Sequence, residues 1–373
     1  MIYNALPRSA HLEISDRCQA GCPMCGRTKL LDGTDSSYIE NVDLTYEEIY
    51  NAFPPEYLEQ SGFDYVNVCG SFGDPLMNRD AFKILEHFAS RDIETALFTN
   101  GSLRSTKWWY ELGQMFAKGH PKNYAYFAID GVDQETHEYY RRFTKLDKIL
   151  ANAKAFMEGG GKAIWNFIVF KHNEHQLEEA QQISHEMGFW KFSAVKTDRF
   201  ILHDIRDGID KKGREFTLER PTDEQWLIDA QHSYARSMIE YYKNYEKRLE
   251  AGETVTTSIH CEVAPKGQIF VGANGFVFPC CYTYGFYKRI LVPDGELGHG
   301  ITKVDPVYPW TDDLNIKHTP ISEIVLHDYF IDTANKWNTL PVPCCQKTCG
   351  IKYIKRKTDV YNNSPSLILS STD

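Results

Sequence analysis

Short strand-like and helical segments alternate through the first 200 residues of the chain. The strand-like segments are rich in β-branched and aromatic residues, which favour sheets. Six of them follow one another, at residues 11–15, 65–69, 94–98, 124–129, 163–170 and 191–195. A succession of strand–helix units predicts a parallel sheet with its helices outside. We therefore expect an α/β fold, as a barrel, a partial barrel or an open sheet, with its chemistry in the loops that leave the strand C-termini.

The clearest helix is predicted for residues 174–187, where apolar residues fall on one face and Gly188 gives a stop signal. The alternation ends near residue 200, so we assign the strand–helix domain to residues 1–200. Residues 222–250 then predict one long helix with an apolar and aromatic stripe, which we interpret as a packing face. Residues 201–257 are accordingly expected to be a helical linker.

Residues 258–350 differ in composition, because they are rich in Gly and Pro and hold six of the ten cysteines. Two short strand-like runs, residues 268–271 and 276–278, flank the turn signal Ala-Asn-Gly and predict a β-hairpin. The final residues are rich in Ser and Asn, so residues 351–373 are expected to form a loose tail.

The chain carries a net charge of −10. Because nucleic-acid binding depends on clustered Lys and Arg, this balance argues against a large nucleic-acid surface. No apolar run reaches the roughly 18 residues of a membrane helix, and the first residues lack the pattern of a signal peptide. We therefore expect a cytoplasmic protein with no membrane partner. In that reducing compartment, metal ligands or free thiols are the expected roles of the cysteines.

Three cysteines follow the first predicted strand at the spacing C-x3-C-x2-C, as Cys18, Cys22 and Cys25. Three thiolates on one short loop can hold three irons of a cubane cluster, and the fourth iron then has no ligand from this motif. An open coordination position is where a metal centre does chemistry. A zinc site would need a fourth nearby Cys or His, and none follows at the spacing of a zinc finger.

This cysteine motif, placed after a first strand in a strand–helix chain, resembles that of the radical S-adenosylmethionine (SAM) superfamily. The resemblance implies a partial (βα)6 TIM-like barrel and a [4Fe-4S] cluster on Cys18, Cys22 and Cys25. It also implies that the reduced cluster cleaves bound SAM to a 5′-deoxyadenosyl radical, which abstracts a hydrogen from the substrate. One departure is Met24, where the family usually has an aromatic residue.

The second predicted strand runs into Phe72-Gly73-Asp74-Pro75, which resembles the family's Gly-Gly-Glu-Pro-like motif. In the family this motif holds the ammonium of the methionyl group. A glycine allows close approach of the backbone to a ligand, and a carboxylate suits an ammonium. The resemblance therefore implies that Gly73, Asp74 and Pro75 bind the cofactor. Without it, the segment would be interpreted as a simple turn before a helix starting near Asn78.

Two further segments look like family motifs near the cofactor. Thr99 and Asn100 begin a Thr-Asn-Gly turn after the third strand, and Asp130 lies in Ala-Ile-Asp-Gly after the fourth. The family has serine in place of that alanine, so one contact to the cofactor should be missing. Arg141, at the end of the next helix, is implied to meet the cofactor carboxylate, with Arg142 as a near-equal candidate.

The cysteines of residues 258–350 resemble the ligands of a twitch or SPASM-like auxiliary-cluster domain. The resemblance implies one auxiliary [4Fe-4S] cluster, for which we prefer Cys261, Cys280, Cys345 and Cys349 as ligands. Cys281 and Cys344 are open alternatives to their neighbours, and a structural zinc site is an alternative for the group. The remaining cysteine, Cys69, is interpreted as a buried thiol.

The resemblance implies a radical SAM oxidoreductase or maturase with two [4Fe-4S] clusters and SAM as cofactors. Its partners would be a small electron-donor protein of the flavodoxin or ferredoxin type and a peptide or small-molecule substrate. We favour modification of a peptide or protein. The alternatives are oxidation of a sugar, aminocyclitol or nucleoside alcohol, or a non-catalytic zinc-binding or redox-sensing module.

Overall fold

The computed structural model describes residues 5–200, 204–227, 251, 259–290, 310–338 and 341–349. Ten strands lie in these residues: β1 (Ser9–Leu12), β2 (Tyr65–Cys69), β3 (Glu94–Thr99), β4 (Tyr124–Ala128), β5 (Lys162–Ile168), β6 (Lys191–Val195), β7 (Ile205–Ile209), β8 (Glu215–Glu219), β9 (Gln268–Val271) and β10 (Val277–Phe278). The first seven helices are α1 (Tyr46–Ala52), α2 (Pro55–Gln60), α3 (Ala81–Ala89), α4 (Thr106–Lys118), α5 (Gln134–Tyr140), α6 (Leu146–Glu158) and α7 (Leu177–Glu186). The later helices are α9 (Cys281–Ile290), α10 (Ile321–Ile324), α11 (Asp328–Asn335) and α12 (Pro343–Cys349).

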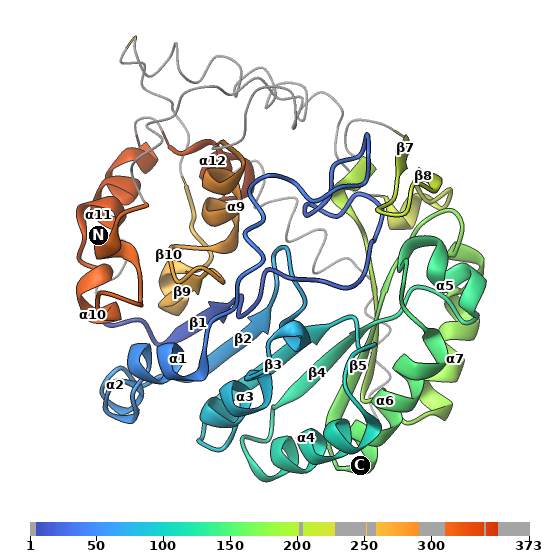
Figure 1. Cartoon of the computed structure of the whole chain (residues 1–373), viewed down its shortest axis with the longest axis horizontal. Helices are drawn as coiled ribbons and strands as arrows, with labels where there is room; N and C mark the ends of the chain where they lie inside the picture. The colour runs from blue at the N-terminus through green and yellow to red at the C-terminus, as the bar shows by residue number, and fades with distance from the viewer. Residues whose placement is uncertain are drawn as a thin grey trace.

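One curved sheet of eight strands organises the molecule, in the order β10-β9-β1-β2-β3-β4-β5-β6. Strands β1 to β6 are parallel neighbours, and α3, α4, α6 and α7 lie along the outer side of the curve (Figure 1). This confirms the α/β fold and the partial TIM-like barrel expected from the alternating segments. No helix in the described part of the chain combines the length and apolar character needed to cross a bilayer.

The core between sheet and helices is aromatic. In α4, Ser105 caps the N-terminus by accepting a bond from the Trp108 N–H, and Trp109 points inward. The Trp109 ring lies 4.8 Å from Phe127 of β4 and 5.9 Å from Phe156 of α6, and all three side chains are fully buried. Burying each such ring stabilises the fold by roughly 1.5–3 kcal/mol. The outer face of the sheet is therefore held firmly against its helices.

The opposite face of the sheet is only half-buried and forms the inside of the partial barrel. Phe98 and Tyr126 stack there with ring centroids 4.3 Å apart, and the hydroxyls of Tyr65 and Tyr124 lie 3.5 Å apart. These side chains alternate along their strands with the fully buried residues that face the helices. The barrel interior is thus lined by aromatic and polar groups.

The C-terminal hairpin extends the barrel sheet. Strand β9 pairs in parallel with β1, with Ser9 opposite Gln268, and β10 returns antiparallel to β9. The turn between them contains Gly275 at φ +93°, a backbone conformation that favours glycine. The predicted hairpin is therefore confirmed. Helix α9 follows it directly and packs against α12 (Figure 1).

Residues 205–219 differ from the helical linker expected there, because they form the antiparallel hairpin β7–β8. Asp210 organises its turn by accepting bonds from the Lys212 and Arg214 N–H groups, while Phe216 and Leu218 are buried. A short 3₁₀ turn at Glu224–Trp226 ends in extended backbone at Leu227. Most of the predicted long helix, residues 228–250, lies outside the described residues, as do residues 351–373.

Other boundaries moved by a few residues. The first strand is Ser9–Leu12 instead of residues 11–15. The helix expected near Asn78 begins at Ala81, because the Asn78 side chain is used to bond the Ile14 and Leu44 carbonyls. The helix predicted at residues 174–187 is confirmed as a 3₁₀ turn leading into α7.

Candidate metal and cofactor site

The loop after β1 carries the three predicted ligands of the first cluster. The thiols of Cys18, Cys22 and Cys25 are half-buried, and the Cys25 N–H donates to the Cys22 carbonyl at 3.1 Å. Burial raises the pKa of Cys18, and Asp74 and the other two thiols raise it further. Thiols in such surroundings ionise when a metal offers a counter-charge. The donor set therefore fits a thiolate-bound iron–sulfur cluster.

The backbone of this cysteine loop is fastened from two sides. Lys211 Nζ donates to the carbonyls of Gln19 and Ala20, and the Gly21 N–H donates to the Arg142 carbonyl at 3.1 Å. A Cβ atom at Gly21 would lie 2.5 Å from the Phe143 ring, so only glycine fits there. The conformation of the cysteine loop is thus fixed by its contacts with Lys211, Arg142 and Phe143.

The glycine loop after β2 lies directly against the chain leaving β1. A Cβ atom at Gly73 would lie 2.0 Å from the Ser15 carbonyl oxygen, so the two backbones touch. The fully buried Glu13 holds this contact, since its Oε1 accepts from the Phe72 N–H at 2.6 Å and the Gly73 N–H at 3.2 Å. Sequence reasoning missed Glu13, although a carboxylate between Leu12 and Ile14 is an unusual residue for an apolar strand.

Asp74, Thr99 and Asn100 meet in one buried network. The Asp74 carboxylate accepts from the Thr99 hydroxyl at 2.9 Å, from the Asn100 N–H at 2.8 Å and from the Asn100 amide at 2.6 Å. It also accepts from the Leu76 N–H at 2.9 Å. Burial raises the pKa of Asp74, while these donors lower it. The carboxylate therefore holds the Thr99–Asn100 turn in place, in addition to any contact with a ligand.

The Thr99–Asn100 turn is joined to the cysteine loop by a residue that sequence reasoning also missed. Gln19 donates through its amide to Asn100 Oδ1 at 2.8 Å and to the Ser102 hydroxyl at 2.7 Å. Because Gln19 follows Cys18 directly, the first ligand and the third strand's loop are coupled by one side chain.

The two candidate arginines have different places. Arg141 donates to the buried carboxylate of Asp130. Burial raises the pKa of Cys22, and the positive charge of Arg141 opposes this shift. Arg142 instead donates to Asp210 of the β7–β8 hairpin at 2.6 Å. Arg142 contacts the cysteine loop only through its carbonyl, so Arg141 is the one whose side chain the structure brings to Cys22 and Asp130.

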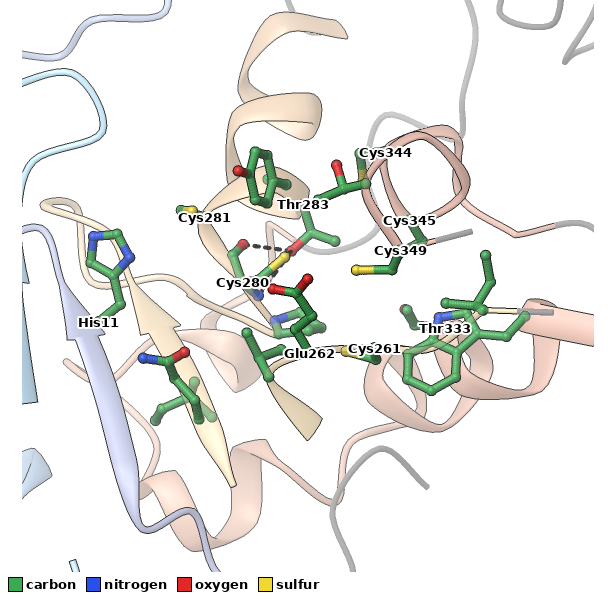
Figure 2. A pocket seen from close by; sticks show the side chains of 18 of the residues that line it. His11, Cys261, Glu262, Cys280, Cys281, Thr283, Thr333, Cys344, Cys345 and Cys349 are labelled. Carbon is green, nitrogen blue, oxygen red and sulfur yellow. Dashed lines mark hydrogen bonds between the residues drawn. The ribbon is translucent and has the colours of Figure 1, made fainter. Parts of the chain in front are cut away.

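The second group of cysteines lines one cavity of about 330 Å³ (Figure 2). They come from the segment before β9, the start of α9 and the helix α12: Cys261, Cys280, Cys281, Cys344, Cys345 and Cys349. Among the described residues, no three His, Cys, Asp or Glu side chains converge closely enough for a single metal ion.

The six thiols that line this cavity differ in which neighbours they contact. The Cys349 thiol, followed by burial, raises the pKa of Cys261. Burial raises the pKa of Cys280 to about 12, with Cys345 adding to the shift. Figure 2 shows the Cys280 and Cys349 side chains facing each other, whereas Cys281 is turned away from them, toward His11. Cys344 contacts the thiol of its neighbour Cys345 and raises its pKa.

The cavity reaches the inner face of the barrel, where His11 and Asn67 are paired residues on β1 and β2. His11 Nε2 bonds the Cys69 carbonyl at 2.8 Å and must therefore carry the hydrogen, which leaves Nδ1 as an acceptor. Burial lowers the pKa of His11 to about 4, so the ring is neutral. Asn67 Oδ1 is buried without a hydrogen-bond partner in the described structure. Neither residue belongs to a motif, and sequence reasoning missed both.

Cysteine loop, glycine loop, Thr99–Asn100 turn and Asp130 all lie where the parallel strands end. A site of this kind on a partial barrel defines an enzyme that works at the C-terminal ends of its strands. Residues 12–182 match the family described as the Radical SAM superfamily. This match supports SAM and the superfamily's iron–sulfur cluster as the cofactors of the site.

A comparison with solved structures found similar chains, and one with a TM-score above 0.5 supports this fold. Native anSMEcpe with bound AdoMet aligns with a TM-score of 0.51 at 13% identity, over 95% of this chain and 96% of that chain. SuiB of Streptococcus suis aligns with a TM-score of 0.48 at 14% identity, over 79% of this chain and 67% of that chain. anSMEcpe has also been solved with the Cp18Cys peptide, at a TM-score of 0.49 and 14% identity, over 95% of both chains. A comparison with curated protein sequences found no match.

Proposed function

We propose that the chain reductively cleaves SAM and abstracts a hydrogen from a peptide or protein substrate. The observation that carries the proposal is the grouping of Cys18, Cys22 and Cys25 on one loop, which contacts the Thr99–Asn100 turn through Gln19. When bound, the cluster supplies one electron and an iron that chelates the amino-acid end of SAM. The protein itself positions the reactants and excludes water.

The cofactor residues have distinct tasks in this proposal. Gly73 and Pro75 form the backbone wall that SAM approaches, and Glu13 fixes that wall by its two hydrogen bonds. Asp74 accepts from the ammonium of SAM in addition to the hydrogen bonds that it accepts from Thr99 and Asn100. Arg141 supplies positive charge beside Cys22, held in orientation by Asp130.

A second [4Fe-4S] cluster is proposed for Cys261, Cys280, Cys345 and Cys349. Supporting this choice, the four thiols line one cavity, and the pKa effects link Cys261 with Cys349 and Cys280 with Cys345. Cys281 is the less favourable neighbour because it is turned away (Figure 2). Cys344 stays an alternative to Cys345, because the two thiols are in contact.

A peptide substrate is favoured by the chemistry of the barrel interior. Its half-buried aromatic residues can take apolar side chains, and the acceptors on His11 and Asn67 can take amide N–H groups. The same acceptors would also suit the hydroxyl of a sugar, aminocyclitol or nucleoside, which keeps a dehydrogenase as the second candidate. We further propose a cytoplasmic location, because the two proposed clusters need reduced cysteine thiols, which a reducing compartment preserves.

Metal and product analysis after anaerobic purification tests the proposal. The wild-type protein should contain about eight irons with matching sulfide and should form 5′-deoxyadenosine from SAM when reduced. The Cys18→Ala/Cys22→Ala/Cys25→Ala variant should lose that product and about half of the iron. Cys69→Ala is the matched control, since Cys69 belongs to neither cysteine group. About two zinc ions per chain would instead favour the non-catalytic module.

Two outcomes would contradict the assignment: 5′-deoxyadenosine from the triple variant, or a full complement of iron in it. The substrate class needs a separate measurement. A peptide-modifying enzyme should change the mass of a peptide encoded beside its own gene, when the two are produced together. A dehydrogenase should leave such peptides unchanged and convert an alcohol to a carbonyl compound.

A further inference from the structure

Three cationic side chains surround one aromatic ring beside the cysteine loop. The Phe143 ring centroid lies 4.9 Å from Lys211 Nζ, 4.5 Å from Lys212 Nζ and 4.8 Å from the Arg214 guanidinium carbon. All three cationic residues are exposed and belong to the turn of the β7–β8 hairpin and its first flanking residue. Concentrated positive charge of this kind is unexpected on a chain with a net charge of −10.

This cationic turn lies against the loop that carries the cluster ligands. The Phe143 ring touches Gly21, and Lys211 Nζ donates to the carbonyl oxygens of Gln19 and Ala20. Partial burial lowers the pKa of Lys211, while the nearby Cys18 and Cys22 thiols are among the groups that raise it. Figure 1 shows the hairpin beside the blue segment that follows β1. The cationic turn therefore packs on the cysteine loop and lies between this loop and solvent.

The charge on this turn is not cancelled. Asp210 is buried and accepts from Arg142 and Arg214, and Arg214 also lies 3.8 Å from Glu138. The Lys211 ammonium donates to carbonyl oxygens of the cysteine loop and lies within electrostatic range of Asp35, but neither contact is an ion pair that cancels its charge. Lys212 is exposed, and its ammonium contacts the Phe143 ring. The turn therefore keeps positive charge at the surface, and this charge can attract an acidic partner at long range.

An apolar side chain stands next to these charges. Leu31 is 84% exposed at the tip of the segment that follows Cys25. That segment is tied to the hairpin, because the Ile209 N–H donates to the Leu30 carbonyl at 3.0 Å and Gly33 packs against Asp210. An exposed leucine on a segment that is bonded to a cationic turn combines the apolar and charged groups of protein-binding surfaces.

We propose that Leu31, Lys211, Lys212 and Arg214 form the docking surface for an acidic one-electron donor protein. The inference rests on the proposed function, which needs one electron for each SAM cleaved. A donor of the flavodoxin or ferredoxin type carries surface carboxylates that would pair with the lysines, and its redox centre would then face the cysteine loop. In the transfer, the donor is oxidised by one electron and the cluster is reduced by the same electron.

Two reductants separate docking from catalysis. Formation of 5′-deoxyadenosine is measured with reduced flavodoxin and, in parallel, with sodium dithionite, a small ion that needs no docking surface. Lys212→Glu should lower the flavodoxin-supported rate at least fivefold at low ionic strength and leave the dithionite-supported rate at the wild-type value. Leu31→Ser should act in the same direction. Added salt should lower the flavodoxin-supported rate of the wild type. The difference between this rate and that of Lys212→Glu should therefore become smaller.

Lys83→Glu is the matched control, because Lys83 is an exposed lysine on α3, on the outer side of the barrel. It makes the same charge change and should leave both rates unaltered. The proposal is overturned if Lys212→Glu keeps the full rate with flavodoxin, or if it lowers both rates equally. A wild-type protein that forms no 5′-deoxyadenosine with dithionite would instead refute the proposed function.

Discussion

Glu13 shows how much one buried side chain can determine in this molecule. It is fully buried, it accepts hydrogen bonds from the Phe72 and Gly73 N–H groups, and its second oxygen has no partner in the described structure. Burial raises its pKa to about 7, the two backbone bonds lower it, Asp16 raises it and Lys288 lowers it. The glycine loop is therefore held by a carboxyl group whose pKa lies near neutrality.

This pKa predicts a dependence of stability on pH. Between pH 4.5 and about 7 the unfolded protein loses the Glu13 proton while the folded protein retains it. The free energy of unfolding should therefore fall by up to roughly 3 kcal/mol as the pH rises through this range. Glu13→Gln should remove that part of the fall, as seen by urea unfolding of both proteins at pH 5 and 7.5. Parallel pH profiles of the two proteins would contradict the prediction.

Asp74 supports a second prediction at the level of single residues. Asp74→Ala should weaken SAM binding by roughly 1.5–3 kcal/mol, because a charged hydrogen-bond partner is lost. Thr99→Val removes only one of the donors to Asp74 and should weaken binding less, through the displaced turn. Anaerobic calorimetry measures both dissociation constants. Asp92→Ala, at a largely exposed side chain, serves as control. An unchanged dissociation constant in Asp74→Ala would remove Asp74 from the site.

At this scale the sequence predicted residues in motifs and missed residues outside them. Cys18, Asp74 and Asn100 could be found because their spacing and neighbours resemble a family pattern. His11 and Asn67 could not, because their importance comes from the register of β1 and β2, which places them together on the cavity wall. A single polar residue in a strand gives no indication of what lies across from it.

At the scale of elements, the chain leaving β1 and the glycine loop are in close backbone contact beside the site. In Gly73→Ala the new methyl carbon would lie 2.0 Å from the Ser15 carbonyl oxygen and 2.7 Å from Asp16 Cα. Both neighbours are backbone atoms, so the elements must separate. We expect a loss of stability of about 2 kcal/mol or more, measured by urea unfolding, together with weaker SAM binding.

Gly285→Ala is the matched control for this substitution. A Cβ atom there would meet only the Phe72 ring, at 4.0 Å, and the position lies within α9. Alanine favours a helix over glycine by up to about 1 kcal/mol, so this variant should be as stable as the wild type or more stable. Equal stability of Gly73→Ala and Gly285→Ala would show that the close backbone contact has no energetic importance.

Elements with a strong periodic pattern were predicted well. The parallel strands and the β9–β10 hairpin follow from alternation and turn signals within each segment. The β7–β8 hairpin was missed because its turn Asp-Lys-Lys-Gly resembles a charged helix surface, and because its two strands bury only Phe216 and Leu218. Its stability comes from the Asp210–Arg142 ion pair, which joins residues far apart in the sequence.

At the scale of the whole molecule, the second cysteine cavity joins the barrel sheet to the C-terminal helices. Its lining comes from β1, β2, β9, α9 and α12. A metal centre that binds across such elements contributes its binding energy to their association. Loss of the proposed auxiliary cluster should therefore loosen the C-terminal helices more than the barrel.

Hydrogen exchange can measure this effect. In Cys345→Ser, amides of α9 and α12 should exchange faster than in the wild type, while those of β3 to β5 keep their protection. Iron should fall by about four per chain. Cys281→Ser, which changes a neighbouring thiol that is turned away from the group, should retain iron and protection. Full iron content in Cys345→Ser would exclude Cys345 as a ligand.

The pairing of β9 with β1 also has a consequence for how the chain assembles. Strand β1 lies between β2 and β9 in the sheet, and its partner residues are Ser9 with Gln268 on that second side. During synthesis β1 therefore waits for more than two hundred further residues, of order ten seconds or longer, before its second edge is covered by β9. Until then β1 presents unpaired backbone groups, the usual starting point for aggregation, so chaperones should bind the nascent chain near β1.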